Sequence, residues 1–450
     1  MTQVPVAPAG EKLTPTAKRA IVGAFLGFGI DFYDIYLPAV ALAPALIYFI
    51  PDNLPVAAAS TLNFLVFAAT LIGRPIGAVI FGHFGDVLGR QRSARIAIGG
   101  FALFTFLIAV LPGYATWGYA SIGLMIALRL VDGIFMGGEY TSANPLAMEA
   151  TPKRLRGLVA GVIQAAYPIG YVAIAISVSI ILAFLPATDL RSPYVQWGWR
   201  IPFVFGAVLA AVFLFAWVRV GESELWQGER TKKAPLAELF SNRRHLRVLA
   251  QIFLMMSGLW LGVELLSSAA PTILEKFLHG SDQGVTNGLI VANVILAAAF
   301  VTMAWLGQRF GRRRMLIISG AMTLVGGGVF YYLMVVSGQN KEPLVVTLVF
   351  YTIALAFVIG PWGIVTSYIN ERFPTAIRAS GYGVGYSLAV IIPSFFSFYL
   401  LWLAHLMPYV YTPLVLLVIA GLLTAIGAWI GPETRHVDLE SIPSSGDEKA

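Results

Sequence analysis

Long apolar runs separated by short polar breaks fill most of the chain. A helix of about 20 apolar residues spans a bilayer, because a helix rises about 1.5 Å per residue and the hydrocarbon is about 30 Å thick. The pattern therefore predicts an all-α membrane protein with twelve transmembrane helices. Their expected limits are 20–49, 60–81, 94–112, 120–147, 157–185, 200–219, 248–276, 285–306, 314–336, 343–368, 377–403 and 409–430.

One long polar interruption, residues 221–245, divides these helices into two sets of six. The predicted parts of the chain are an N-terminal segment 1–19, a six-helix bundle 20–219, a linker 220–247, a second six-helix bundle 248–430 and a tail 431–450. The start is polar up to Arg19, and the apolar run that follows is longer than the core of a signal peptide. We therefore expect no cleaved signal peptide.

Lysine and arginine gather at one end of the predicted helices. Of the 30 such residues, 24 fall in the termini, the linker and the loops after even-numbered helices, and 4 fall in the opposite loops. Cytoplasmic loops carry the excess of positive charge. The count therefore predicts an inner-membrane protein with both termini in the cytoplasm. Because the cations lie in loops and not among aromatic residues on one face, the net charge of +7 does not indicate nucleic-acid binding.

Composition excludes several other classes of protein. The chain is 58% hydrophobic and 12% charged, whereas a soluble domain has about 25% charged residues. It has no cysteine for disulfides or thiolate metal sites, its five histidines are scattered, and it has no phosphate-binding loop or nucleophile–base set. We expect no enzyme, no metal and no cofactor. The expected surroundings are membrane lipid, and a monomer suits this architecture.

Two loop landmarks recur in the two halves. "GHFGDVLGRQR" (82–92) and "GQRFGRRR" (307–314) begin 225 positions apart, and "EATPKRLRG" (149–157) and "ERFPTAIRASG" (371–381) begin 222 apart. Repeats of this kind predict two duplicated six-helix halves, related by an axis along the membrane normal, as in transporters whose halves rock against each other. The second loop lacks an acidic counterpart of Asp86, because Phe310 and Gly311 stand there.

Glycines in these loops permit tight turns, and their carboxylates can bind arginines across the membrane face. We predict a cytoplasmic gate that opens when such contacts break, although tight loops with orienting charges would show a similar pattern. The predicted gate residues are Gly82, Asp86, Gly89, Arg90, Glu149, Arg156, Arg312, Glu371 and Arg378.

Several motifs resemble a known family. "GHFGDVLGR" resembles the loop signature of the major facilitator superfamily, and "RLVDGIFMGGEY" (129–140) resembles the fourth-helix signature of its metabolite:proton symporters. "VGESELW" (220–226) and "GPETRHVDLE" (431–440) resemble the segments after the sixth and twelfth helices of those symporters. Phosphate and aromatic-acid symporters are similar in pattern. The resemblance implies alternating access around a central substrate site and names no substrate.

Asp31 and Asp34 interrupt the first apolar run and share one helix face, because they lie three residues apart. They are roughly 16 and 21 Å deep in the first helix, and Arg129 is roughly 13 Å deep from the other side in the fourth. Intramembrane charges cost about 2.5–3.5 kcal/mol each and tend to pair. We expect an ion pair of Arg129 with one aspartate and titration of the other; Asp31 is favoured as the partner and Asp34 as the titrating group. A static network of all three is the alternative.

Further acids and aromatic residues complete the predicted site. Glu139 either accepts the proton on its way in or binds the cytoplasmic gate, and Glu264 either contacts substrate or stays neutral. The predicted proton-coupling residues are Asp31, Asp34, Arg129 and Glu139. The predicted substrate contacts are Tyr33, Gln164, Tyr167, Trp260, Glu264, Asn293, Trp362 and Tyr386, although aromatic residues at helical spacing also suit plain packing.

The leading functional prediction is a proton-coupled symporter that imports a small organic metabolite. Arg74 and Arg129 both lie within predicted spans, but Arg129 is taken as the only deep basic residue, against five buried acids. A monocarboxylate or a zwitterion therefore suits the site better than a di- or trianion. The alternatives are a proton symporter for a neutral sugar or polyol, an uncoupled facilitator, and a membrane nutrient sensor that binds without transporting.

Overall fold

The computed structural model describes residues 13–51, 54, 56–228, 235–278, 282–440 and 442. Predictions for residues 1–12, 229–234, 441 and 443–450 lie outside this part. Within it, twelve helices are long and apolar enough to cross a membrane and no strand occurs, which confirms the predicted fold class. The spans are Pro15–Tyr48, Leu65–Val87, Arg90–Ala109, Tyr119–Glu149, Arg156–Phe184, Tyr194–Trp217, Arg243–Glu275, Gln283–Phe310, Arg312–Gln339, Leu344–Asn370, Thr375–Leu403 and Tyr409–Ile430.

Most spans consist of more than one helical element. The first half contains α1 (Pro15–Ile35), η1 (Leu37–Leu42), η2 (Ala43–Tyr48), α2 (Val56–Val87), α3 (Arg90–Ala109), α4 (Tyr114–Trp117), α5 (Tyr119–Glu149), α6 (Arg156–Gln164), α7 (Ala166–Phe184), η3 (Tyr194–Gly198) and α8 (Arg200–Trp217). The linker contains α9 (Glu224–Gly228) and α10 (Pro235–Ser241).

The second half contains α11 (Arg243–Val263), η4 (Glu264–Ala269), α12 (Ala270–Lys276), α13 (Asp282–Phe310), α14 (Arg312–Ala321), η5 (Met322–Gly327), α15 (Gly328–Gln339), α16 (Leu344–Ile359), α17 (Trp362–Asn370), η6 (Thr375–Ile377), α18 (Arg378–Ser387), η7 (Leu388–Val390), η8 (Pro393–Phe395), α19 (Phe396–Leu403), η9 (Tyr409–Tyr411) and α20 (Thr412–Ile430).

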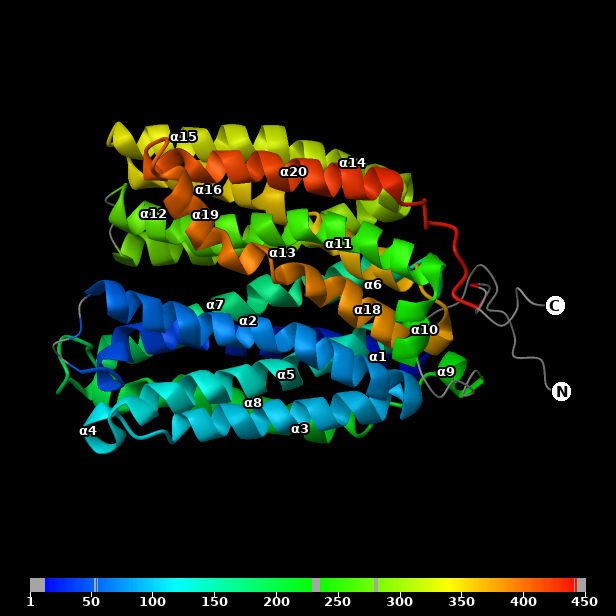
Figure 1. Cartoon of the computed structure of the whole chain (residues 1–450), viewed down its shortest axis with the longest axis horizontal. Coiled ribbons are helices and arrows are strands. Elements are labelled where there is room, and N and C mark those ends of the chain that lie inside the picture. The colour runs from blue at the N-terminus through cyan, green and yellow to red at the C-terminus, as the bar shows by residue number, and fades with distance from the viewer. Residues whose placement is uncertain are drawn as a thin grey trace.

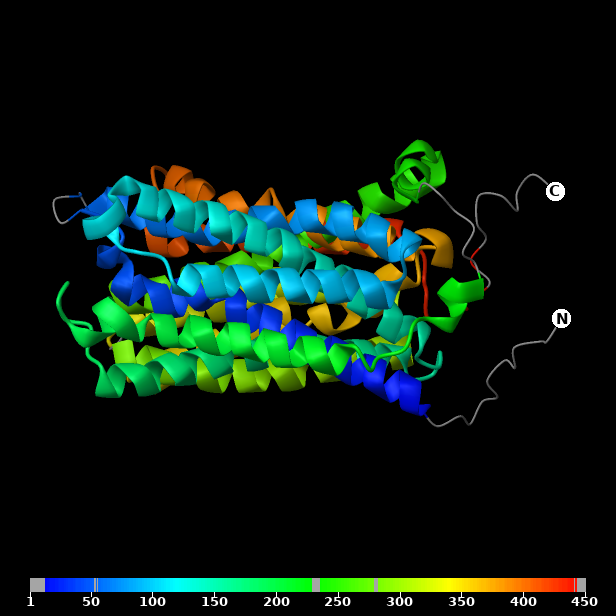
Figure 2. The same ribbon diagram turned by 90° about the horizontal axis from the view of Figure 1, so that it is seen from below.

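The helices run roughly along the long axis of the molecule in two groups (Figure 1). The elements up to α8 form one group and those from α11 onward form the other. The first helix begins and the last helix ends at the same end of the molecule, where α9 and α10 also lie (Figures 1 and 2). We call this the linker end and the opposite end the far end. The division at 20–219 and 248–430 stays our assignment of domains.

Two segments expected to be loops are largely helical. α2 continues to Val87 and α3 begins at Arg90, so the turn between them is made at Gly89, with φ +107°. α13 ends at Phe310 and α14 begins at Arg312, with Gly311 between them at φ +106°. Glycine reaches this part of the backbone map without steric cost. Polar residues in the sequence mark where the hydrocarbon of the membrane ends, but the helices continue beyond that boundary.

Close contact between α2 and α5 organises the first half. A Cβ atom on any of four glycines would meet a backbone carbonyl oxygen of the facing helix. These glycines are Gly73 and Gly77 on α2 and Gly133 and Gly137 on α5. Small residues four apart let membrane helices touch backbone to backbone. The contact brings Arg74 of α2 and Arg129 of α5 into the centre of this half.

Several of the spans are interrupted. The first, seventh and ninth contain the π-helical segments η1, η4 and η5, the fifth breaks at Ala165, the tenth at Gly360–Pro361 and the eleventh at η7. Irregular backbone within a membrane is tolerated where protein or a water-filled cavity surrounds it, and transporters use such breaks at binding sites. These interruptions therefore indicate where in the fold a ligand site is to be sought.

We predict that Gly89→Ala lowers the stability of the protein by about 1–3 kcal/mol, because alanine is strained at this φ and its Cβ would meet the carboxylate of Glu222. Gly123→Ala is the control, since no atom lies within 4 Å of a Cβ placed there. Thermal unfolding of the purified variants measures the difference. Equal midpoints for the two variants would contradict the assigned turn.

Candidate functional site

Arg129 lies in a buried ionic network within the first half. Its Nη1 atom donates to Asp34 Oδ2 at 2.8 Å and to Asp132 Oδ2 at 2.9 Å, and its Nε atom donates to Thr70 Oγ1 at 2.9 Å. All three charged side chains are buried. Asp34 and not Asp31 is therefore the partner of Arg129, and the expected pairing was wrong. Three residues move a carboxyl group by about 4.5 Å along a helix, which is enough to exchange partners.

Asp31 and Glu139 form a second, separate group. Both side chains are buried, and their carboxyl oxygens have no hydrogen-bonding partner in the described part of the chain other than each other. The two carboxyl groups lie beside each other, and both interact electrostatically with Arg74. Of the two expectations for Glu139, the one that joined it to the gate is wrong, since its neighbour is Asp31.

Arg74 is the residue that sequence reasoning undervalued. Its guanidinium carbon lies 5.5, 4.8 and 5.6 Å from the ring centres of Phe32, Tyr140 and Trp260. The side chain is buried, and its Nε and Nη2 atoms have no acceptor in the described part of the chain. Arg129 is therefore not the only deep basic residue. An arginine within an apolar run was the available signal, and it is the same signal that singled out Arg129.

Three aromatic residues of the second half form a cluster that we call the aromatic triad: Trp260, Trp362 and Tyr386. Their ring centres lie 4.6, 5.4 and 5.7 Å apart, each pair edge to face. Trp260 Nε1 donates to the carbonyl of Tyr386 at 2.8 Å. Within the described residues, Trp362 Nε1 and the Tyr386 hydroxyl have no partner. Arg74 packs on Trp260, so the triad meets the first half at this cation.

Helix interruptions place several predicted residues. Gln164 is the last residue of α6, Trp362 is the first of α17, Glu264 begins η4, and Tyr386 lies directly before the end of α18. Glu264 is buried and accepts a hydrogen bond from Ser268 Oγ at 3.1 Å. Four of the eight predicted substrate contacts therefore lie where helical geometry is broken.

Hydrogen bonds join the two halves beside the triad and between the triad and the linker end. Gln164 Nε2 donates to Thr366 Oγ1 at 2.7 Å, and Asn144 Nδ2 donates to the Tyr382 hydroxyl at 2.7 Å. Tyr140 also bonds to Ser387. Each pair takes one residue from each half, so these contacts hold the halves together.

Toward the far end the halves meet through hydroxyl groups. The hydroxyls of Tyr36 and Tyr167 lie 3.2 Å apart, and that of Tyr167 lies 2.7 Å from Ser267 Oγ. A vestibule of about 610 Å³ begins at this level. Both halves line it, with Tyr36, Phe67, Tyr171, Ser179, Ser267, Ser268, Thr272, Glu275 and Thr286 among its residues.

Two predicted substrate contacts lie elsewhere. The Tyr33 hydroxyl donates to the carbonyl of Pro202 at 3.2 Å, and its ring packs on Phe205, so it faces α8 and not the triad. Asn293 donates to the carbonyl of Leu289, one turn earlier in its own helix. Polar residues on apolar helices commonly satisfy themselves in this way, and residue type alone does not distinguish them from ligand contacts.

The predicted gate residues at the linker end form two clusters, which we call the latch. In the first cluster Glu149 Oε1 accepts from Arg378 Nη1 at 2.8 Å and lies 3.4 Å from Arg90 Nη2. Arg90 Nη1 also lies 2.6 Å from Asp86 Oδ1. Asp86 accepts from the backbone N–H groups at residues 379 and 380, at 3.1 and 2.9 Å. Residues of both halves take part, so this cluster closes the linker end.

The second cluster repeats the first 222 positions later in the chain. Arg312 Nε lies 3.0 Å from Glu371 Oε2, and Arg156 Nη1 lies 3.7 Å from Glu371 Oε1. Gln308 accepts from Arg312 Nη2 at 2.8 Å and from the backbone N–H of Gly157 at 3.0 Å. Gln308 is therefore the counterpart of Asp86, and the register that placed Phe310 and Gly311 there was wrong.

Burial raises the pKa of the Glu371 carboxyl, although Arg312 and Arg156 act in the opposite direction. Burial also lowers the pKa of the neighbouring Arg372.

Gly82 belongs to the same contact between the halves, since a Cβ placed on it would lie 2.8 Å from the Cα atom of Ser380. A larger residue at position 82 would therefore hold the halves apart.

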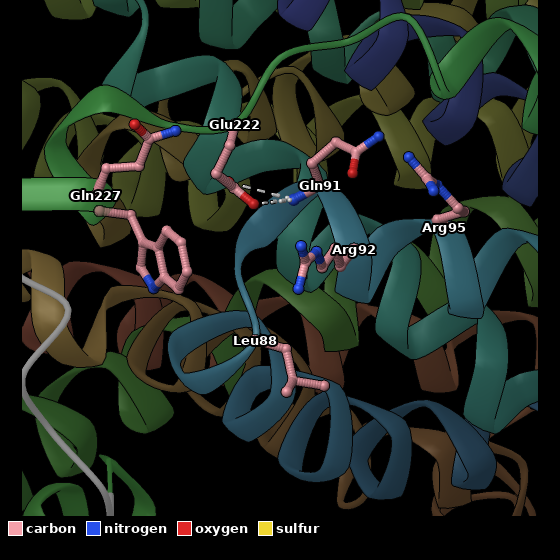
Figure 3. A pocket seen from close by; sticks show the side chains of 7 residues that line it. Leu88, Gln91, Arg92, Arg95, Glu222 and Gln227 are labelled. Carbon is pink, nitrogen blue, oxygen red and sulfur yellow. Dashed lines mark hydrogen bonds between the residues drawn. The ribbon is translucent and has the colours of Figure 1, made fainter.

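Segments that follow the last helix of each half hold the third helix of the same half. Glu222 accepts from the backbone N–H groups of Arg90 at 3.0 Å and Gln91 at 3.1 Å, beside a pocket of about 660 Å³ (Figure 3). Glu433 accepts from those of Arg312 and Arg313 at 2.8 and 3.1 Å. A carboxylate at a helix N-terminus satisfies free N–H groups and the helix dipole.

The tail also reaches the latch. Arg378 Nη2 donates to the carbonyl of Leu439 at 2.9 Å, and Arg156 Nη1 donates to that of Val437 at 3.2 Å. Both arginines therefore bind a carboxylate and a tail carbonyl together.

Residues 20–397 match the Major Facilitator Superfamily. The chain belongs to this family. It is 31% identical over 400 residues to the shikimate transporter of Escherichia coli, covering 85% of this chain and 86% of that protein. It is 30% identical to the inner membrane metabolite transport protein YhjE of the same organism, covering 95% and 98%. This member of the superfamily is thus a metabolite transporter, not an enzyme, and a multi-pass inner-membrane protein.

Solved structures agree with the fold. The proton:xylose symporter XylE bound to 6-bromo-6-deoxy-D-glucose superposes with a TM-score of 0.76 at 22% identity, covering 95% of this transporter and 98% of XylE. The resemblance drawn from the sequence motifs is confirmed at the level of the family.

We predict that Glu149→Gln loosens the latch, because removing one partner of a buried ion pair costs about 3–5 kcal/mol. The chain has no cysteine, so Thr141→Cys, which lies buried behind the latch, serves as a reporter. Its labelling by a maleimide should rise by about tenfold or more when Glu149→Gln is added. Glu224→Gln, an exposed carboxylate at the same end, is the control and should leave the rate unchanged. Equal rates in both variants would show that Glu149 does not hold the latch.

Proposed function

We propose that the transporter is a proton-coupled symporter that imports a small monocarboxylate or zwitterion by alternating access. The observation that carries this proposal is a cluster of buried polar atoms without partners. Arg74, Asp31 and Glu139 all belong to it, and the triad adds two free donors. Buried polar groups are nearly always hydrogen-bonded, so a cluster of exceptions in one place indicates a ligand.

Arg74 is the proposed anchor for the carboxylate of the substrate. Its Nε and Nη2 atoms form a planar fork that matches the two oxygens of a carboxylate. The triad beside it provides apolar surface and two donors for the organic part, and its ring faces also suit an ammonium group. Arg74 is the one cation here without an ion-pair partner in the described part of the chain, which favours a single carboxylate over a dianion. The similarity to a shikimate transporter supports a substrate that carries one carboxylate.

Charge balance supplies the proposed coupling. Two adjacent buried carboxyls do not both ionise readily, so Asp31 and Glu139 share one negative charge, which Arg74 offsets. A substrate carboxylate that binds Arg74 adds a second negative charge to the same dry region. Uptake of one proton by the pair restores neutrality, so substrate and proton bind together. This moves the proposed proton site from Asp34, which is fixed by Arg129, to Asp31 and Glu139.

The latch and the vestibule fit one step of alternating access. The vestibule reaches inward from the far end, and the latch closes the linker end. The distribution of lysine and arginine supports a cytoplasmic linker end. Substrate and proton therefore enter from the far end, and the latch breaks when the halves rock to release both into the cytoplasm.

We predict that Arg74→Lys weakens carboxylate binding by on the order of 100-fold, because lysine keeps the charge but loses the fork, and truncating a buried charge pair costs about 2–5 kcal/mol. A panel of monocarboxylates, zwitterions, dicarboxylates and sugars, tested in proteoliposomes under an imposed pH gradient, first identifies the substrate. Arg309→Lys, an exposed arginine at the linker end, is the control. If the substrate is a neutral sugar and Arg74→Lys leaves its uptake unchanged, this assignment is wrong.

We predict that Asp31→Asn abolishes accumulation driven by a pH gradient while exchange of substrate across the membrane persists, because the single carboxyl that remains beside Arg74 has no acidic neighbour and stays ionised. Glu139→Gln should behave in the same way. Accumulation in proteoliposomes and proton uptake by a pH-sensitive dye are the measurements. Wild-type accumulation by Asp31→Asn would refute the proton site. If a protonophore does not change the rate of uptake by the wild type, an uncoupled facilitator is favoured instead.

A further inference from the structure

A groove of about 320 Å³ lies between α1 and α8 at the linker end, apart from the triad and the latch. Its rim carries three cations, Lys18, Arg19 and Arg219. Its floor is apolar and consists of Val22, Gly23, Leu26, Phe213, Ala216, Trp217 and Val220. The groove therefore combines a cationic mouth with a hydrophobic interior.

The three cations are free to bind an anion. All three side chains are exposed, and none has a carboxylate within ion-pair distance among the residues that the structure describes. They lie at the end of the molecule where the excess of lysine and arginine gathers. The anionic lipids of a cytoplasmic leaflet attract such clusters, at about 1 kcal/mol per cation.

The apolar part of the groove faces the membrane. Val22 is 54% exposed and Leu26 is 44% exposed, and both belong to a helix that crosses the bilayer. The cations lie at the helix ends, and the apolar floor continues from them along α1. An amphiphile with an anionic head and a long apolar chain matches this arrangement, whereas a free phosphate would leave the floor unused.

We propose that this groove binds an anionic phospholipid, with its phosphate among Lys18, Arg19 and Arg219 and an acyl chain along Val22 and Leu26. The proposal does not depend on the substrate or on proton coupling.

The second half shows that the groove is not a necessary result of the fold. The equivalent pair of helices there is α11 and α20, which pack backbone to backbone. A Cβ on Gly258 would meet the carbonyl of Ala420, and one on Gly427 would lie 2.5 Å from the backbone nitrogen of Met255. In the first half the facing glycine, Gly23, instead meets the ring of Trp217. The pocket of about 360 Å³ that α11 and α20 do line has no charged residue in its lining, so a groove with a cationic rim is a feature of the first half.

A lipid in this groove would contact the helix that carries the proposed proton site. Asp31 follows Leu26 by five residues, about 7.5 Å along the axis of α1. The bound chain would fill the space between α1 and α8 and support the first turns of α1.

The test is lipid binding to the full chain in a neutral detergent. Palmitoyl-oleoyl-phosphatidylglycerol and the matching phosphatidylcholine are titrated, and native mass spectrometry counts the bound lipids. We expect the phosphatidylglycerol to bind more tightly. The triple variant Lys18→Gln, Arg19→Gln, Arg219→Gln should lose about fivefold in affinity per cation removed, which corresponds to about 1 kcal/mol each.

A matched triple variant, Lys153→Gln, Arg154→Gln, Arg314→Gln, removes three cations from the same end and should bind like the wild type. Val22→Trp keeps the cations but fills the groove and should also weaken binding, so the test stands even if the first triple variant fails to fold. Equal binding of the two lipids, or equal losses in both triple variants, would overturn the proposal. The proposal would also be overturned if the wild type is a dimer that only the first triple variant dissociates, because the groove would then be an interface between two copies.

Discussion

The cost of keeping a guanidinium dry inside a membrane constrains this whole structure. Arg129 meets that cost with two aspartates and a threonine hydroxyl. Arg74 does not, because it has three aromatic rings around it and only a pair of shared carboxyls nearby. The backbone contact of α2 with α5 fixes both arginines at this depth. One charge is thus fully committed to structure, and the other stays available for an incoming partner, which is the asymmetry that the proposed coupling requires.

The two halves share one arrangement of latch residues but differ in the side chains that they place at the centre of the molecule. At the linker end their clusters correspond residue for residue, with Gln308 in the place of Asp86, and each half supplies an arginine to the glutamate of the other. At the centre the first half provides charged groups and the second half provides the aromatic triad. Under the proposed function, the symmetric latch serves the movement of the halves, and the asymmetric centre serves recognition of the substrate. The charged groups come from one half and the aromatic surface from the other, so only the two halves together make a complete site.

Much of this was predictable from the sequence. The apolar runs gave the number of helices, and the repeated loop motifs gave the composition of the latch, because both depend on local pattern. The partner of Arg129 was predicted wrongly, since a few ångströms along α1 decide between Asp31 and Asp34. Arg74 was seen within a span but not used, because its significance depends on Trp260, a residue of the other half. Tyr33 and Asn293 fit the composition of a site, yet the direction in which each side chain points follows from packing that no local pattern encodes.

The tail after α20 has a structural role that its polar composition does not suggest. Glu433 closes the start of α14, and the carbonyls of Val437 and Leu439 complete the coordination of two latch arginines. This polar segment is thus part of the closure at the linker end. A shortened chain must therefore extend through Leu439, and a reporter fused any earlier would disturb the contacts that hold both halves together.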